Sequence, residues 1–412
     1  MTGVLFMQSQ TFAGADTMMH AQIMRYLDRD AFQVHVALNR DDDPAAPSSA
    51  AAAISAVPGV RTVRIDFGPS LHDAEGLTRL LLARRAPGLA LGLARLIAYA
   101  RANDIRIVHC TEKPRDALYG LAVARAAGAL CVIHLHVKWE RWINRGVRWA
   151  LRHADGVIGV SRFVADAAIA AGGCPPERVF AVVNGLDLAR WDGPADGTAI
   201  RREFGVPDGV PLIGVVSRLF VWKGHLDLVR ALAPLKRRGL DFRLLIVGED
   251  DPRGAPGRPP LSAEIRQLVA SLDLSDRVIF AGWRRDVRDI MAALDLYAMP
   301  TFEEPCAVVF LEAMAARLPI VALASGGTPE EVEHGVSGLL SPPGDIAALS
   351  ENIATLLRDP DLRARMGAAG RTAVEGRLSA PAMAQRVEEV YRTLLDRRGL
   401  RVTKRSDVAI AR

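Results

Sequence analysis

The sequence predicts an α/β protein with two doubly wound domains, each built on a parallel sheet. Short apolar runs of strand length alternate with patterns of helix length, which is typical of successive βαβ units. The alternation restarts at Leu212–Val216, after the Gly-, Asp- and Pro-rich stretch Trp191–Thr198. A chain of 412 residues is long enough to bury two cores. We therefore expect a first domain over residues 1–194 and a second over residues 195–378.

The expected strands of the first domain are short and apolar, and ligands of such sheets bind beyond the carboxyl ends of the strands. They are Val4–Met7, Val34–Leu38, Val60–Ile65, Ile105–Thr111, Leu130–Val137, Asp155–Val160 and Val179–Val183. Helical patterns cover Thr17–Leu27 and Lys138–Ala154, and another begins at Ser161.

The second domain repeats the pattern. Its expected strands are Leu212–Val216, Leu244–Val247, Val278–Phe280, Leu296–Met299 and Pro319–Leu323. Its expected helices are Leu226–Arg237, Ala263–Leu272, Val287–Ala293, Asp345–Arg358 and Pro360–Ala369. A last helical pattern, Ala380–Arg397, precedes a tail that we expect to be frayed.

Composition narrows the class of protein. Half of the residues are apolar and 24% are charged, which indicates a globular chain. Residues 1–195 carry 22 Lys and Arg against 18 Asp and Glu, a small surplus that favours an acidic ligand or a membrane surface but not a nucleic acid. The four cysteines lack metal-binding spacing, so we expect reduced thiols in a cytoplasmic protein. No signal-peptide pattern is visible, and arginines interrupt the most apolar segment, Leu80–Ala100, so a soluble or peripheral protein is expected.

A ligand site is expected within Pro300–Asp345. Glu304 follows a strand, Glu312 lies in a helical pattern, and a Gly-Gly pair at 326–327 follows the next strand. A turn and a helix N-terminus at a strand end attract an anion through free N–H groups and the helix dipole. Carboxylates on both sides can accept hydrogen bonds from hydroxyls. A phosphate together with a polyol indicates a nucleotide sugar.

Two cations follow the first strand of the second domain. Arg218 and Lys223 lie in the loop after Leu212–Val216, where they could neutralise a diphosphate. The alternative is that they are ordinary surface charges.

The first domain has weaker signals. Gly14 lies beyond the first strand, where it lets the backbone approach a ligand or serves only the turn. His134 and His136 share one face near a strand end, where they are placed for chemistry or are buried, hydrogen-bonded imidazoles. The run Asp41–Asp43 could hold a metal ion, but the prolines that follow it favour a solvated loop.

The stretch Lys138–Ala154 combines tryptophan and arginine at helical spacing. As one helix it would place tryptophans, Trp149 included, on one side and Arg141, Arg145, Arg148 and Arg152 on the other. This pattern fits a basic helix at a membrane or an anionic acceptor. It also fits an ordinary domain helix with tryptophan in the core and arginine in water.

With these pieces in order, nearly the whole chain resembles the GT4 family of retaining glycosyltransferases. The matching motifs are Asn184-Gly-Leu-Asp187, Arg218…Lys223-Gly224, Gly282-Trp-Arg-Arg-Asp-Val287, Pro300-Thr-Phe-Glu-Glu304…Glu312-Ala-Met-Ala315, Leu318-Pro-Ile-Val-Ala322 and Gly326-Gly-Thr-Pro-Glu330. The resemblance implies the GT-B fold, in which two Rossmann-like domains face a central cleft. It also implies that a C-terminal helix, residues 379–398, crosses back to the first domain before a flexible tail, residues 399–412.

The resemblance assigns roles in donor binding. Glu312 would hold the ribose hydroxyls, and Arg218 and Lys223 the diphosphate. Glu304 and the backbone of Cys306, Ala307, Val308 and Val309 would hold the transferred sugar and the distal phosphate. His136 would lie close to the donor sugar, and Gly14 would flank the phosphates.

The implied reaction is retaining transfer of a sugar from a nucleotide-diphosphate sugar to an acceptor hydroxyl of a glycan or lipid. His136, Glu304, Arg218 and Lys223 would form its catalytic centre. Fixed positive charge at the leaving diphosphate would make a metal unnecessary, and no other cofactor is implied. Arg141, Arg145 and Arg148 would face the acceptor or an anionic membrane.

Two positions depart from the family pattern. Cys306-Ala307 replaces Phe-Gly, which adds a Cβ and costs stability if φ is positive there. Ala13-Gly14-Ala15-Asp16 replaces Gly-Gly-Ala-Glu. The alternatives to a transferase are a binding or scaffold protein with a degenerate donor site and another GT-B enzyme, such as a sugar-nucleotide epimerase or a phosphorylase. A nicotinamide dehydrogenase is disfavoured because no GxGxxG opens either domain.

Overall fold

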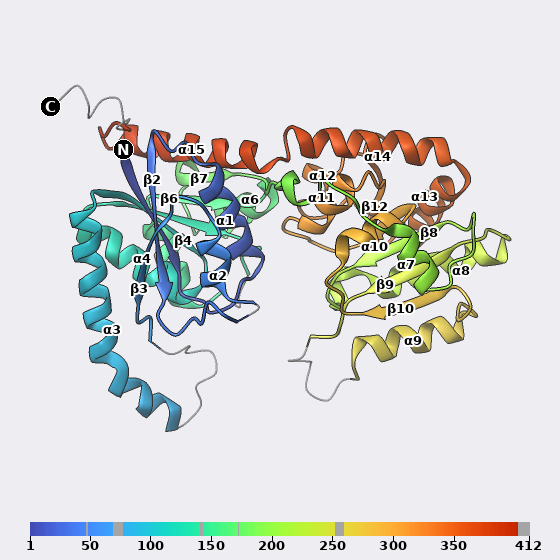
Figure 1. Cartoon of the computed structure of the whole chain (residues 1–412), viewed down its shortest axis with the longest axis horizontal. Coiled ribbons are helices and arrows are strands. Elements are labelled where there is room, and N and C mark those ends of the chain that lie inside the picture. Colours follow the sequence, from blue (N-terminus) through green and yellow to red (C-terminus); the bar gives the residue numbers. More distant parts are fainter. Residues whose placement is uncertain (47, 69–76, 141–142, 172, 252–258, 403–412) are drawn as a thin grey trace. The chain divides into compact units, whose positions relative to one another are not determined.

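The chain forms two compact units (Figure 1). The computed structural model describes all residues except 47, 69–76, 141–142, 172, 252–258 and 403–412, and it describes no side chains for 77–86. Unit 1 holds Met1–Asn184 and the chain from Ala380 onward, whereas unit 2 holds Gly185–Ser379. The chain first passes from unit 1 to unit 2 between Asn184 and Gly185, before the expected boundary at residue 194. Leu186 N–H donates to the Leu378 carbonyl at 2.9 Å, so the two ends of unit 2 lie side by side.

Unit 1 is built on a parallel seven-stranded sheet in the order β3-β2-β1-β4-β5-β6-β7. Its strands are β1 (Thr2–Gln8), β2 (Phe32–Asn39), β3 (Arg61–Ile65), β4 (Ile105–Thr111), β5 (Leu130–Leu135), β6 (Gly156–Gly159) and β7 (Val179–Ala181). Every residue of β1, β5 and β6 is buried, as expected for a sheet covered on both faces. The strand order reverses between the neighbours β1 and β4.

The helices of unit 1 follow its strands. They are α1 (Ala15–Tyr26), α2 (Ala50–Ser55), α3 (Leu77–Ala102), α4 (Pro114–Ala127), α5 (Arg145–His153), α6 (Arg162–Ala170), a 3-10 turn at Pro176–Arg178, and α15 (Ala380–Arg397). The last helix packs against α1. Its Tyr391 reaches the sheet, where the hydroxyl lies 2.6 Å from Nδ1 of His109 in β4.

Unit 2 is built on a parallel six-stranded sheet in the order β10-β9-β8-β11-β12-β13. Its strands are β8 (Leu212–Val216), β9 (Arg243–Val247), β10 (Val278–Gly282), β11 (Leu296–Met299), β12 (Ile320–Leu323) and β13 (Gly338–Ser341). The order again reverses between the first and fourth strands, here β8 and β11.

The helices of unit 2 pack on one another as well as on the sheet. They are α7 (Gly197–Glu203), α8 (His225–Arg237), α9 (Leu261–Ser271), α10 (Val287–Ala293), α11 (Val308–Ala315), α12 (Thr328–Glu331), α13 (Ile346–Arg358) and α14 (Pro360–Glu375), with 3-10 turns at Leu188–Arg190 and Val221–Lys223. Helix α8 packs on α9 and α13, α11 packs on α10 and α14, and α13 also contacts α14.

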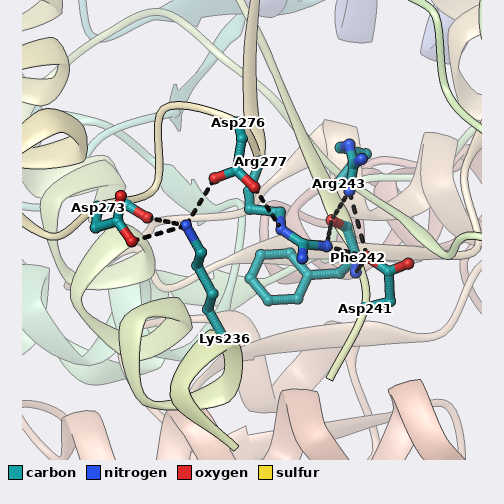
Figure 2. Close-up of polar contacts among 7 residues, drawn as sticks. All are labelled: Lys236, Asp241, Phe242, Arg243, Asp273, Asp276 and Arg277. Atoms are coloured by element: carbon teal, nitrogen blue, oxygen red, sulfur yellow. Dashed lines mark hydrogen bonds and ion pairs between the residues drawn. The ribbon is translucent and has the colours of Figure 1, made fainter. Parts of the chain in front are cut away.

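Charged side chains surround the amino ends of β9 and β10 (Figure 2). Lys236 at the end of α8 pairs with Asp273 and Asp276 at 3.0 and 2.8 Å. Asp241 accepts from Arg277 and, at 3.3 Å, from Arg243. Exposed pairs of this kind each contribute little stability. The cluster lies at the amino ends of the strands, so it belongs to the edge opposite the one where parallel sheets bind ligands.

One expected helix is shorter in the structure. Among the described residues of Lys138–Ala154 the helix covers Arg145–His153, and the Asn144 side chain caps its start by accepting from Val147 N–H at 2.9 Å. The alternative that tryptophan packs in the core does not hold for Trp149, since this side chain is 53% exposed.

Candidate functional site

The carboxyl edge of the unit 2 sheet brings together the loops that follow β8 and β11. The two strands are neighbours, yet the chain leaves β8 toward one side of the sheet and β11 toward the other. Doubly wound sheets bind ligands where the order reverses in this way. The first loop carries Arg218 and Lys223, and the second carries Glu304. The structure therefore places the predicted cations and a predicted carboxylate at one edge.

Lys223 and Glu304 form a buried ion pair across this edge. The ammonium of Lys223 donates to Oε2 of Glu304 at 2.6 Å, and the Thr301 hydroxyl donates to the same oxygen at 2.8 Å. The two charged side chains are only 17% and 9% exposed. A buried charge is costly unless it is paired, so each group stabilises the other here. The lysine predicted for the diphosphate thus contacts the glutamate predicted for the sugar.

Two glycines allow the backbone to close around this pair. Gly224 has φ +76°, and a Cβ there would lie 2.1 Å from the carbonyl oxygen of Pro300. Gly326 has φ +62°, and its Cβ would lie 2.4 Å from the carbonyl oxygen of Glu304. The sequence predicts free N–H groups at the Gly-Gly turn, but Gly327 N–H donates to that same oxygen at 2.7 Å. The turn therefore fixes the backbone of Glu304.

Helix α11 begins directly after this loop. Its N-cap, Ala307, has φ −88°, so the alanine that replaces glycine carries no positive-φ strain. Ala307 N–H donates to Oε2 of Glu331 at 2.8 Å, and Cys306 Sγ lies 3.4 Å from Oε1. The Ala307 side chain makes no capping hydrogen bond, and the first turn of the helix contains no acidic residue. The N–H groups of Val308 and Val309 lack acceptors within the helix, which suits an anion.

Two carboxyl groups next to this helix have perturbed pKa values. Burial raises the pKa of Glu331 to about 8, against the opposing hydrogen bond from Ala307. Burial also raises the pKa of Glu312, on α11, to about 7, and the charge of Arg190 opposes this shift. A carboxyl group poised near neutral pH can donate as well as accept a hydrogen bond, and a ribose diol can use both.

A cavity of about 370 Å³ opens beside Arg218 at the ends of β8 and β9. Ser217, Glu249, Trp283 and Arg284 also line it. Arg284 binds both Glu203 and Asp286 through its guanidinium, whereas Arg218 is exposed. The volume lies within the range of small-molecule sites. Arg218 is thus placed to meet a charged ligand in this cavity.

Unit 1 has its own carboxyl edge, where β1 and β4 meet. Gly14 is the N-cap of α1 with φ −82°, and a Cβ there would lie 2.6 Å from Oδ1 of Asp16. Asp16 forms an ion pair with Lys113, which follows β4. The role of Gly14 that the structure shows is therefore to leave room for Asp16.

His136 lies just beyond β5, and its backbone N–H donates to Oε2 of Glu112 at 3.2 Å. Burial lowers the pKa of His136 well below its usual value and raises the pKa of Glu112 to about 7. His134 lies within β5 and is fully buried. The alternative of a buried imidazole therefore holds for His134, and His136 alone of the two is partly exposed.

The remaining predicted residues are spread over unit 1. Arg141 lies outside the described residues. Arg145 is exposed at the start of α5, and Arg148 is half-buried. Asp42 is buried, where it accepts from the Ser49 hydroxyl at 2.7 Å and from Ala51 N–H at 2.6 Å. That residue is a structural acceptor, which corrects the expectation of a wholly solvated Asp41–Asp43 loop.

Several residues of both edges are not predicted from the sequence. In the sequence, Glu331 is one of two adjacent acids at the start of a helix, and no sequence pattern indicates that its side chain is buried. Thr301 gives no signal either. Asp16 and Lys113 could have been found, because each follows one of the two strands between which the order reverses.

Two family models together match most of the chain. The Glycosyltransferase Family 4 model matches residues 19–190, and the Glycosyl transferases group 1 model matches residues 196–373. A GDP-mannose-dependent monoacylated alpha-(1-6)-phosphatidylinositol monomannoside mannosyltransferase of Corynebacterium glutamicum is 33% identical over 289 residues, which are 66% of this chain and 72% of that protein. The chain belongs to glycosyltransferase family 4. The family predicted from the sequence motifs is confirmed.

Further similarities fix the fold and the enzyme class. HepE of Anabaena, solved in complex with UDP, superposes with a TM-score of 0.75 at 25% identity, covering 95% of this chain and all of that one. The predicted GT-B fold is thereby confirmed. A 2-deoxystreptamine glucosyltransferase of Streptomyces kanamyceticus is 32% identical over 217 residues, 52% of this chain, which spans about half (54%) of that relative. Mannosyl- and glucosyltransferases among the relatives confirm the prediction of a hexosyltransferase-type glycosyltransferase. Within the described residues, no helix is long and apolar enough to cross a membrane.

Proposed function

We propose that this glycosyltransferase moves a hexose, with retention, from a nucleotide-diphosphate sugar to a hydroxyl group of a glycan or a lipid. The observation that carries the proposal is the carboxyl edge of unit 2. There Lys223, Glu304 and the uncapped start of α11 lie where the strand order reverses. The relative named for GDP-mannose and the neighbour solved with UDP support a nucleotide-linked donor.

The roles proposed for the side chains follow from their surroundings. Glu312 binds the ribose diol, for which its raised pKa suits it. Arg218 and Lys223 neutralise the diphosphate, with the N–H groups of Val308 and Val309 beside it. Glu304 holds the transferred sugar, together with the backbone of Cys306 and Ala307. In unit 1, we propose that His136 orients the sugar and that Gly14 flanks the phosphates.

The proposed step forms a bond between the acceptor oxygen and the anomeric carbon as the bond to the leaving phosphate oxygen breaks. The acceptor proton passes to that phosphate oxygen on the same face of the sugar, which preserves the configuration. Negative charge grows on the diphosphate, and preorganised cations and N–H groups stabilise it most where water is excluded. We propose that these groups replace a metal ion and that the reaction needs no cofactor.

We also propose that the protein acts in the cytoplasm, at the inner face of the membrane. The support is the basic surplus of the first half and the exposed Arg145 at the start of α5. Retention of the protein by anionic vesicles at low salt, lost in an Arg145→Ala/Arg148→Ala double variant, is expected. Equal binding of both proteins would remove the membrane part of the proposal and leave the transfer part intact.

The transfer is tested with purified protein and a panel of UDP-, GDP-, ADP- and dTDP-linked hexoses. A bound donor at about 100 times its Kd adds about 2.7 kcal/mol of stability, so thermal shift identifies the donor. We expect release of nucleoside diphosphate with that donor, and the same rate with a chelator present. Glu312→Ala should abolish both the thermal shift and the turnover, whereas Glu333→Ala, an exposed acid of unit 2, should change neither.

Product analysis separates the alternatives. A β-linked product from an α-linked donor would overturn retention. An epimerised nucleotide sugar would indicate an epimerase, and a sugar phosphate formed only with inorganic phosphate would indicate a phosphorylase. Failure of every donor to shift the melting temperature or to turn over would favour a binding or scaffold role.

A further inference from the structure

Three histidines from separate elements meet inside unit 1. His20 lies on α1, His109 on β4 and His134 on β5, and each is fully buried. One ring nitrogen from each lies within 4.8 Å of the others. The ring centroids of His20 and His109 are 4.7 Å apart, and those of His20 and His134 are 5.5 Å apart. We name these three residues the histidine cluster.

The spacing of one pair of nitrogens in the histidine cluster suits a small tetrahedral cation. Nε2 of His109 lies 3.3 Å from Nδ1 of His134. Zinc binds imidazole nitrogen at about 2.0–2.1 Å, so two ligands at a tetrahedral angle stand roughly 3.3–3.4 Å apart. These two nitrogens are thus already at the distance that a shared metal ion requires.

Hydrogen bonds within the protein leave part of the cluster unsatisfied. Among the described residues, Nδ1 of His20 and Nε2 of His134 are buried and have no partner. Leaving a buried polar group without a hydrogen bond costs about 1–3 kcal/mol. A chain of hydrogen bonds from Tyr391 through His109 to His134 accounts for three ring nitrogens but not for these two. A metal ion bound by Nε2 of His109 and Nδ1 of His134 leaves Nε2 of His134 unchanged, so the unpartnered atom that points to a further ligand is Nδ1 of His20.

The surroundings resemble the outer shell of a metal site. Metal-bound histidines generally give their second ring nitrogen to a hydrogen-bond partner, which fixes the ring. Nδ1 of His109 meets the Tyr391 hydroxyl at 2.6 Å, which leaves Nε2 to face His134. Nε2 of His20 lies 3.5 Å from Nε2 of His136. Two of the three rings thus have such a partner in place.

We propose that His20, His109 and His134 bind one divalent transition-metal ion of the zinc class. Imidazole nitrogen suits zinc, cobalt, nickel and copper, whereas magnesium and calcium require oxygen ligands, which this set does not contain. The metal ion takes the place between Nε2 of His109 and Nδ1 of His134, and the proton of that hydrogen bond moves to the other nitrogen of the same ring, so each imidazole stays neutral. Its ligands are on strands and a helix of unit 1, so its role is to fix these elements and, through His20, the ring of His136.

The protonation state of the cluster is compatible with this assignment. Metal ligation requires neutral imidazole. Burial lowers the pKa of His20 to about 4 and the pKa values of His109 and His134 well below the usual range. Asp16 supplies nearby negative charge that acts on His20, against the positive charge of Lys113. The cluster is therefore uncharged at neutral pH and can accept a cation.

The test measures metal content directly. The full chain, freed of any affinity tag, is refolded with Zn²⁺, passed over a chelating resin and analysed by elemental mass spectrometry. We expect one zinc per chain and a melting temperature several degrees above that of protein refolded with chelator. His134→Gln should bind substoichiometric zinc. His35→Gln is the matched control, since His35 is a buried histidine of the same unit that pairs with Tyr99 outside the cluster.

A second measurement needs no variant. Refolding the natural chain with Co²⁺ should give the strong visible absorption of a tetrahedral nitrogen site, and zinc should displace that absorption. Absence of bound zinc and cobalt from the natural chain would overturn the proposal. Full zinc content in a folded His134→Gln variant, or a weak octahedral cobalt spectrum, would do the same. None of these readouts depends on transferase activity, so failure here is distinct from failure of the proposed function.

Discussion

The carboxyl edges of the two sheets each carry an ion pair, and the acid and the lysine exchange places between them. In unit 1 the acid Asp16 follows the first strand, β1, and Lys113 follows β4. In unit 2 Lys223 follows the first strand, β8, and the acid Glu304 follows β11. Each ion pair joins the two loops between which the strand order reverses. The common topology therefore brings together the loops after the first and fourth strands of each sheet. The residues in these loops determine which loop carries the positive charge of the ion pair.

The differences between the two edges decide what each can bind. Around Lys223 the unit 2 edge adds Arg218 and the uncapped start of α11, which together suit a diphosphate. Around Lys113 the unit 1 edge adds imidazoles and the buried Glu112, which suit neutral hydroxyls or a metal ion instead. A shared topology thus fixes the place of a site without fixing its ligand.

The largest effect is expected from Lys223→Met. The substitution leaves Glu304 buried without its partner, which typically costs about 3–5 kcal/mol of stability. The substitution also removes a positive charge beside the proposed leaving diphosphate. Loss of one preorganised donor typically lowers kcat by about 10²–10³. Chemical unfolding and donor turnover measure the two effects separately.

The control is Lys236→Met, which removes a cation of the same unit at the amino ends of its strands (Figure 2). It should leave turnover unchanged. Equal losses of activity in both variants would show that the carboxyl edge of unit 2 has no special role, and the proposed difference between the edges would fail.

The next effect concerns the buried acid Glu331. Its folded pKa, about 8, lies above its ordinary value of 4.5, so the folded state holds the proton more tightly. The resulting stability is present below about pH 4.5 and is lost as the pH rises through about 8. At about 1.4 kcal/mol for each pKa unit, a few kcal/mol are at stake. Glu331→Gln should therefore flatten the fall in melting temperature between pH 5 and about 8.

Glu333→Gln provides the reference for that series, because Glu333 is an exposed neighbour on the same segment. Its melting temperatures should follow those of the natural chain. A Glu331→Gln profile as steep as the natural one would mean that the carboxyl group of Glu331 is ionised in the folded protein at neutral pH.

A smaller loss is expected from Asp16→Asn in unit 1. The partner, Lys113, is 22% exposed and keeps some hydration, so we expect about 1–3 kcal/mol of destabilisation. Since this edge is not proposed to neutralise the diphosphate, kcat should fall less than in Lys223→Met. Asp30→Asn, an exposed change in the same unit, should be neutral. A kcat loss as large as that of Lys223→Met would show that the two pairs share one task.

Much of the fold could be predicted from the sequence because its signals are local. β4, β8, β11 and α15 match their expected bounds, since each is a clear apolar run or a helical repeat with marked ends. The start of the helix in Lys138–Ala154 could not be predicted correctly. The helical periodicity of the sequence begins before Asn144, whereas the side chain of Asn144 caps α5.

The site could be predicted in part for the same reason. Arg218, Lys223 and Glu304 were found because they follow strands whose carboxyl ends share an edge. The contact between Lys223 and Glu304 joins residues far apart in sequence, and no local pattern encodes it. Glu331 was missed because only the tertiary fold turns its carboxyl group toward Ala307.

The smallest effect is expected from Ala307→Gly, which restores the family residue at the start of α11. The native φ of −88° suits alanine, so glycine relieves no strain and adds freedom to the unfolded chain. Glycine is also the better N-cap residue, which offsets that loss. The change in stability should therefore stay below about 1 kcal/mol, against the several expected for Lys223→Met. Because the buried Cβ disappears next to the proposed phosphate site, the ratio of kcat/KM between two donors is the sensitive measurement. An unchanged ratio would show that donor choice in unit 2 does not depend on this position.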